Sequence, residues 1–297
     1  MAPALTPRLL ALALASSPLH ALVPHLPVVN MGTPPAPAGV PRCCGGGGRV
    51  VNASCCNPAE KAAVLTWLAA GGVGMESSLA YGTSPGLRDG LRASGRSRSS
   101  VWITTKVQCG TTQAHVTAEI AQVLAQLGVP SVDLLTIHYP EKGCMVGTSL
   151  AETWSAFEQA KSAGQTRFIG TSEFSIQQLA VLLSLGKSVP YVNQWPMSVG
   201  GANVTEMLRY CSAHNIRTEG FSVLRTGCMS QPLVRTLAAK HNVSTAQVCI
   251  RFVTQLAGSA VVSSSSQEYD REDLSSTSGV TLSEDEMAQL ASLARPG

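Results

Sequence analysis

The feature that most constrains the fold is a repeated alternation of short apolar runs with longer amphipathic stretches. Amphipathic stretches of about 10 to 15 residues separate most of the runs, the spacing expected of helices between strands. The eight apolar runs lie at residues 26–31, 73–77, 101–106, 132–137, 166–171, 191–194, 216–221 and 259–262. The run at 132–137, VDLLTI, is apolar almost throughout rather than alternating, which is typical of parallel strands covered on both faces. The pattern predicts an α/β fold.

Eight strand and helix units favour a closed (β/α)8 TIM barrel over a doubly wound open sheet. The open sheet would carry a Gly-x-Gly-x-x-Gly turn after its first strand, and this chain has none there. A barrel takes about 250 residues, so the 297-residue chain holds one, and we place it at residues 26–297. Ser283 and Glu286 have the spacing of a capping box, which predicts an extra helix at the C-terminal end.

Local signals predict where several helices begin and end. Helix starts are expected at Asn57-Pro58, at Thr112 and at Ser244. Glycines are expected to end helices at Gly71, Gly128, Gly164 and Gly186.

The N-terminal 25 residues resemble a cleavable leader. Arg8 precedes an apolar run at 9–15, and small residues follow as far as Ala21. This pattern indicates a signal peptide for secretion or a transit peptide for an organelle. The alternative is a disordered Ala-rich tail on a cytoplasmic protein. No later stretch reaches about 18 uninterrupted apolar residues, so we expect no membrane span.

Charge and cysteine content bound the partners. Charged residues make up 13% of the chain and the net charge is +3, so no basic stripe suited to nucleic acid is expected. We expect a small-molecule substrate and a monomer. Four of the nine cysteines lie in or beside apolar stretches and are predicted to be buried thiols: Cys109, Cys144, Cys211 and Cys249. Two vicinal pairs flank a glycine run and form either a metal site or disulfide clip, or a Gly-rich loop without one: Cys43, Cys44, Cys55 and Cys56.

Four polar side chains fall at the carboxyl ends of neighbouring predicted strands. Glu76, Tyr81, Lys106 and His138 are therefore expected to meet at the barrel mouth, where the loops after the strands form active sites. The set suits proton transfer to an oxygen as hydride reaches its carbon. We expect the Lys106 ammonium to lower the pKa of Tyr81, Glu76 to hold that ammonium, and His138 to orient the substrate oxygen.

The chain resembles the aldo-keto reductases over about residues 26–293. Matching passages are GVGMESSLAYGT at 72–83, VWITTKV at 101–107, VDLLTIHYP at 132–140, ETWSAFEQAKSAGQTRFIGTSEFS at 152–175 and VNQWPM at 192–197. The resemblance implies reduction of an aldehyde or ketone with Tyr81 as general acid. It also implies a nicotinamide cofactor held by Ser172, the residue at 173, Gln194, Phe221, Ser222 and Leu224.

Several positions depart from the family pattern. Glu76 replaces an aspartate, and Glu173 replaces an asparagine and cannot donate a hydrogen bond. The lysine that begins the family's 2′-phosphate clamp is absent from VVSSSSQEYDRED at 261–273. Ser264, Ser265 and Arg271 are the remaining candidates there. We keep NADPH as the expected cofactor, with NADH as the alternative.

These departures leave competing functions open. The first is an active NADP(H)-dependent carbonyl reductase. The second is a nucleotide-binding barrel with weak or lost catalysis, which acts as a sensor or regulatory subunit. The third is a barrel without affinity for nucleotides. The substrate cannot be predicted, because the loops that select it vary most.

Overall fold

A computed structural model of the chain describes residues 26–32, 53–140, 142–145, 147–225, 227–263 and 266–295. Eight parallel strands form a closed barrel in sequence order, and β1 pairs with both β2 and β8. The strands are β1 (Val29–Met31), β2 (Gly74–Glu76), β3 (Trp102–Val107), β4 (Val132–Ile137), β5 (Thr166–Ser172), β6 (Val192–Pro196), β7 (Arg217–Phe221) and β8 (Ala260–Val262). The predicted (β/α)8 TIM barrel is confirmed.

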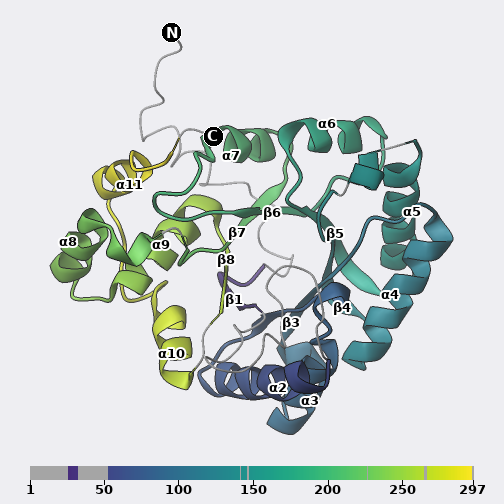
Figure 1. Cartoon of the computed structure of the whole chain (residues 1–297), viewed down its shortest axis with the longest axis horizontal. Helices are drawn as coiled ribbons and strands as arrows, with labels where there is room; N and C mark the ends of the chain where they lie inside the picture. The colour runs from purple at the N-terminus through teal and green to yellow at the C-terminus, as the bar shows by residue number, and fades with distance from the viewer. Residues whose placement is uncertain are drawn as a thin grey trace.

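Helices surround the ring of strands, as Figure 1 shows. They are α2 (Ala53–Ala69), α3 (Ser84–Ser94), α4 (Gln113–Leu127), α5 (Ser149–Ser162), α6 (Ile176–Ser184), α7 (Thr205–Ala213), α8 (Pro232–His241), α9 (Thr245–Ala257), α10 (Gln267–Ser275) and α11 (Glu284–Ala291). Short 3-10 turns lie between them: η1 (Leu79–Tyr81), η2 (Arg98–Ser100), η3 (Lys142–Met145) and η4 (Cys228–Ser230). The predicted extra C-terminal helix is α11.

Most predicted helix ends are confirmed, and one is wrong. Thr112 caps α4, while Ser244 and Ser283 form capping boxes on α9 and α11. The helix expected to start at Asn57 begins earlier, at Ala53, and Pro58 lies inside it. Asn57 does not cap this helix, because its side-chain oxygen accepts a hydrogen bond from the backbone N–H of Gly86 on α3 at 3.0 Å.

Close packing of α2 on α3 depends on glycine. A Cβ atom on Gly90 would lie 2.6 Å from Cβ of Val64, well inside normal contact. Val64 and Trp67, one turn apart on α2, are fully buried against the barrel. Trp102 and Trp154 are buried as well.

One buried carboxylate braces the amino-terminal end of the barrel. Asp133 on β4 forms ion pairs with Arg98 at 2.6 Å and with Arg167 at 3.0 Å. It also accepts from the backbone N–H of Ile103 on β3. Arg251 on α9 donates hydrogen bonds to uncharged groups, which are the side chains of Gln255 and Thr281 and the backbone oxygen of Thr277.

The cysteine prediction is wrong for three of its four residues. Cys109 pairs with Cys144 and Cys228 pairs with Cys249, whereas Cys211 is a buried free thiol. Their Cα atoms lie 5.3 and 6.4 Å apart, within the normal range for disulfides. Spacing along the chain did not reveal these partners. The first bridge joins the segment after β3 to η3, which follows the neighbouring strand β4, and the second joins η4 to α9.

Several predictions lie outside the described residues. They concern the leader at residues 1–25, the cysteines at 43 and 44, and the side chains of Cys55 and Cys56. Ser264 and Ser265 lie outside them as well. No helix in the described part of the chain is long and apolar enough to cross a membrane.

Candidate active site

The four residues predicted to form a site come together at the carboxyl ends of β2, β3 and β4. Glu76 is the last residue of β2, Lys106 lies near the end of β3, and His138 directly follows β4. Parallel pairing of β2 with β3 and of β3 with β4 brings these three ends side by side. Tyr81 closes the set from η1, the turn that follows β2.

Glu76 and Lys106 form a buried ion pair. Oε1 of Glu76 lies 2.9 Å from Nζ of Lys106, and both side chains are at most 5% exposed. Burial lowers the pKa of Lys106, but Glu76, Tyr81 and Glu219 raise it more, so the net shift is upward and the ammonium stays charged. The role of Glu76 in the reaction stays a prediction.

Tyr81 contacts His138 directly. The phenolic oxygen lies 3.1 Å from Nε2 of His138, and the two rings meet edge to face. Burial lowers the pKa of His138 to about 3, with a further contribution from Lys106, so the imidazole is neutral at pH 7. The expected fall in the pKa of Tyr81 is wrong: burial raises it, and the opposing effect of Lys106 is smaller. Tyr81 is therefore protonated at neutral pH and carries a proton to donate.

Behind the ion pair lies a polar network that the sequence analysis missed. Gln194 accepts from Nζ of Lys106 at 2.5 Å, and its side-chain NH2 donates to Glu76 at 2.5 Å and to Glu219 at 2.8 Å. Strand register explains this contact, because Gln194 on β6 pairs directly with Glu219 on β7. The carboxylate of Glu76 contacts Lys106 through Oε1 and Gln194 through Oε2.

Glu219 is the buried anchor of this network. Its Oε1 accepts from Asn30 at 2.8 Å and from Ser259 at 2.9 Å. Burial and the charge of Glu76 raise its pKa to about 7, against the opposing effect of the hydrogen bonds from Gln194 and Ser259 and of the Lys106 charge. An acidic residue inside the predicted strand 216–221 was the signal for it in the sequence.

Ser78 is a second residue that the sequence analysis missed. It is fully buried, caps η1 and lies 3.1 Å from Nδ1 of His138. Its position three residues before Tyr81, at the start of the turn that carries this tyrosine, was the available signal.

The predicted cofactor residues fit a nicotinamide group in part. Phe221 ends β7 as a half-buried ring whose centroid lies 5.9 Å from Nζ of Lys106, where it offers a stacking face at the mouth. Ser172 is buried at the end of β5, next to Gln194 in the register. Both hydrogens of the Gln194 NH2 are already donated to carboxylates, so only its oxygen remains to accept another hydrogen bond.

The remaining cofactor candidates lie around this centre. Ser222 and Leu224 follow β7 and are half-buried, and Ser222 has a left-handed φ of 59°. Glu173 has a φ of 60° and is exposed. Arg271 is exposed on α10. Arg271 therefore does not belong to the group formed by Glu76, Tyr81, Lys106 and His138, and its part in cofactor binding stays a prediction.

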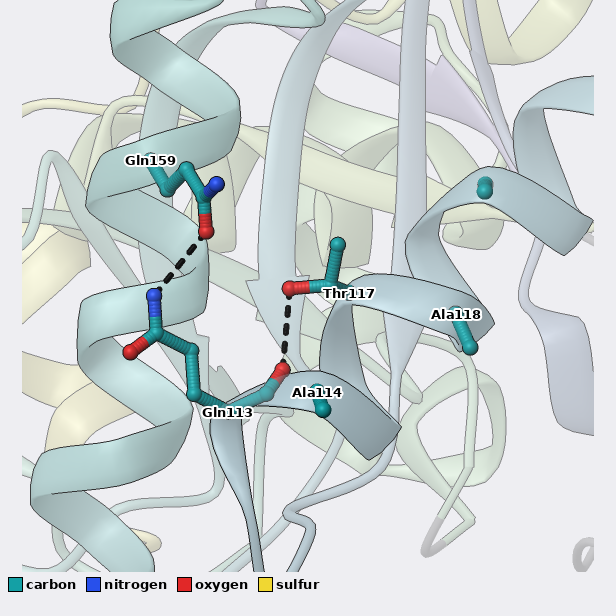
Figure 2. A pocket seen from close by; sticks show the side chains of 6 residues that line it. Gln113, Ala114, Thr117, Ala118 and Gln159 are labelled. Carbon is teal, nitrogen blue, oxygen red and sulfur yellow. Dashed lines mark hydrogen bonds between the residues drawn. The ribbon is translucent and has the colours of Figure 1, made fainter.

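A surface hollow between α4 and α5 is not part of this site. Figure 2 shows Gln113 bonded to Gln159 across it, at 2.9 Å, with Thr117 bonded to the backbone of its own helix. Ala114 and Ala118 supply much of the remaining wall. None of the lining side chains is ionisable, so the hollow offers no acid, base or nucleophile.

Comparison with known proteins now adds to the geometry. A sequence model of the aldo/keto reductase family matches residues 57–295. The chain belongs to the aldo/keto reductase family. It is 32% identical, over 66% of its length and 70% of the relative's, to the 9,11-endoperoxide prostaglandin H2 reductase of Trypanosoma cruzi. It is 28% identical to the uncharacterized oxidoreductase YtbE of Bacillus subtilis, over 71% of this chain and 74% of that one.

Solved structures agree on the fold. An aldo/keto reductase from Brucella melitensis superposes with a TM-score of 0.79 at 24% identity, covering 91% of this chain and 94% of its own. Members of this family use nicotinamide cofactors, so the chain belongs among the NAD(P)H-dependent oxidoreductases.

Proposed function

We propose that this chain reduces an aldehyde or ketone to an alcohol with NADPH, and that Tyr81 supplies the proton. The observation that carries the proposal is the contact of a protonated phenol with a neutral His138, beside the Glu76–Lys106 pair. All four side chains lie at the end of the barrel where loops form active sites.

The proton chemistry follows from the electrostatics of the site. When bound, the reduced nicotinamide supplies the hydride that reaches the carbonyl carbon. Tyr81 gives its proton to the carbonyl oxygen, and the phenolate left behind is stabilised by the Lys106 ammonium. Glu76 keeps that ammonium charged and in place, and a proton from water restores the phenol.

We assign the cofactor to the part of the barrel mouth around Phe221. In this proposal Phe221 stacks on the nicotinamide ring, while Ser172, Glu173 and the oxygen of Gln194 contact its carboxamide. Ser222 and Leu224 lie along the pyrophosphate, and Ser264, Ser265 and Arg271 serve the far phosphate. NADH is the alternative, because the clamp lysine of the family is absent and four acidic residues lie near Arg271 in the sequence of α10: Glu268, Asp270, Glu272 and Asp273.

The test mixes the full chain with an activated aldehyde and the reduced cofactor, and measures the consumption of reduced nicotinamide by its absorbance. Tyr81→Phe is expected to lower kcat by at least about 100-fold, the usual contribution of a general acid. Tyr210→Phe, on the outer helix α7, is the matched control and should retain full activity. Running both cofactors decides between NADPH and NADH.

A different result would favour the second candidate. Quenching of protein fluorescence by either cofactor without any turnover would indicate a nucleotide-binding barrel that has lost catalysis. The raised pKa of Tyr81 and the engaged amide of Gln194 are the observations that keep this candidate in view.

A further inference from the structure

The hydroxyl of Ser78 is fully committed to three neighbours. It caps η1 by accepting from the backbone N–H of Ala80 at 3.2 Å. It lies 3.2 Å from the backbone oxygen of Lys106 and 3.1 Å from Nδ1 of His138. A hydroxyl group has one hydrogen to donate and two lone pairs to accept with.

Each of the three hydrogen bonds of the Ser78 hydroxyl has a definite donor and acceptor. The Ala80 N–H can only donate, so it occupies one lone pair of the hydroxyl. The Lys106 carbonyl can only accept, so it takes the single hydrogen. The remaining lone pair faces Nδ1 of His138, which must therefore carry a hydrogen.

The position of this hydrogen also determines the state of the other ring nitrogen of His138, Nε2. A neutral imidazole has one N–H, and burial keeps His138 neutral. With the hydrogen on Nδ1, the Nε2 atom is an acceptor, and the phenol of Tyr81 at 3.1 Å is its donor. We propose that Ser78 is a positioning residue that holds His138 as the Nδ1–H tautomer, which leaves Tyr81 as the only proton donor of the pair.

This tautomer changes what His138 does in the reaction, a step that rests on the proposed function. A bare Nε2 cannot donate to a carbonyl oxygen, but it accepts from a hydroxyl group. Before the reaction that group is Tyr81. Once the Tyr81 O–H bond has broken and the proton has passed to the substrate oxygen, the alcohol O–H is the donor that faces Nε2. His138 therefore stabilises a hydroxyl group at this place, whether the phenol of Tyr81 or the alcohol product, and offers no hydrogen bond to the carbonyl substrate.

The experiment is nitrogen NMR of the full chain labelled at histidine, at pH 7, without cofactor. The chain has six histidines, and His138→Gln identifies the resonances of the one in question. In the wild type the hydrogen is expected on Nδ1. In Ser78→Ala the ratio of the Nδ1–H to the Nε2–H form is expected to fall about tenfold, the effect of one lost hydrogen bond.

Two further variants separate the tautomer from packing. Ser77→Ala removes the neighbouring buried hydroxyl, which bonds Thr83 and Ser84 instead of His138, and should keep the wild-type ratio. Ser78→Thr retains the hydroxyl and should keep it too. An Nε2–H form in the wild type, an unchanged ratio in Ser78→Ala, or an equal fall in all three variants would overturn the proposal.

Kinetics give a second readout. Ser78→Ala is expected to lower kcat for carbonyl reduction about tenfold with little change in KM, because the donor loses its fixed acceptor while the pocket stays intact. If the chain has no reductase activity, the NMR result still decides the tautomer. Failure of the proposed function is thus distinguishable from failure of this inference.

Discussion

Glu60 offers a quantitative test of how burial acts on charge in this barrel. Its side chain on α2 is fully buried, and neither carboxylate oxygen has a hydrogen-bond partner among the described residues. Burial raises its pKa from 4.5 to about 8. The folded state therefore binds this proton more tightly than the unfolded state, so stability is present at low pH and is lost as pH rises from 4.5 to 8.

The magnitude follows from linkage. The raised pKa lowers the free energy of unfolding by about 4 kcal/mol at pH 7.5 and by about 1 kcal/mol at pH 5, because Glu60 ionises in the unfolded chain while it stays largely protonated in the folded one. Glu60→Gln removes the ionisation but keeps the shape of the side chain. Its stability relative to wild type should therefore improve by about 3 kcal/mol between pH 5 and pH 7.5.

Urea unfolding at the two pH values measures this difference. Other titrating groups contribute equally to wild type and variant, so they cancel in the comparison. Glu206→Gln, an exposed position on α7, is the matched control and should show no such gain. Equal pH dependence of wild type and Glu60→Gln, within about 1 kcal/mol, would refute the assignment of a raised pKa to Glu60.

Three further predictions test other parts of the structure. Asp133→Asn should lower the free energy of unfolding by about 3 kcal/mol, because two arginines lose their buried partner; a change below about 1 kcal/mol in urea unfolding would contradict this. Replacing Cys228 and Cys249 by serine should cost about 3 kcal/mol, and a phosphine reductant should then have less effect on the variant than on the wild type. For Glu219, the pKa of about 7 predicts a step in kcat near pH 7 that Glu219→Gln abolishes; a step that persists in the variant would assign it to another group.

Much of the barrel could be predicted because its signals are local. The run at 132–137 coincides with β4, since a strand buried on both faces is apolar along its whole length. Thr112 and Ser283 were found because a cap bonds residues only three positions away. The start of α2 was missed, because Asn57 bonds α3 instead of its own helix.

In the candidate site too, residues with local signals could be predicted and long-range contacts could not. Glu76, Lys106 and His138 could be predicted, because strand ends mark the barrel mouth. The contacts of Glu219 could not, although its acidic side chain inside a predicted strand was a signal, because its donor Asn30 lies 189 residues away and barrel closure makes them neighbours. The disulfide partners could not be predicted either, because cysteine spacing alone does not determine pairing.

The contacts of Gln194 have a consequence for how this lineage can vary. The side-chain amide of Gln194 bonds the Lys106 ammonium and the carboxylates of Glu76 and Glu219 at once. A substitution at 76, 194 or 219 therefore changes how much a substitution at either of the other two positions alters stability. Shortening Glu76 to the aspartate typical of the family would withdraw an acceptor from Gln194 and leave a buried donor unsatisfied. The three positions are therefore expected to be epistatic, and an ancestor or descendant with aspartate at 76 should carry a compensating change at 194 or 219.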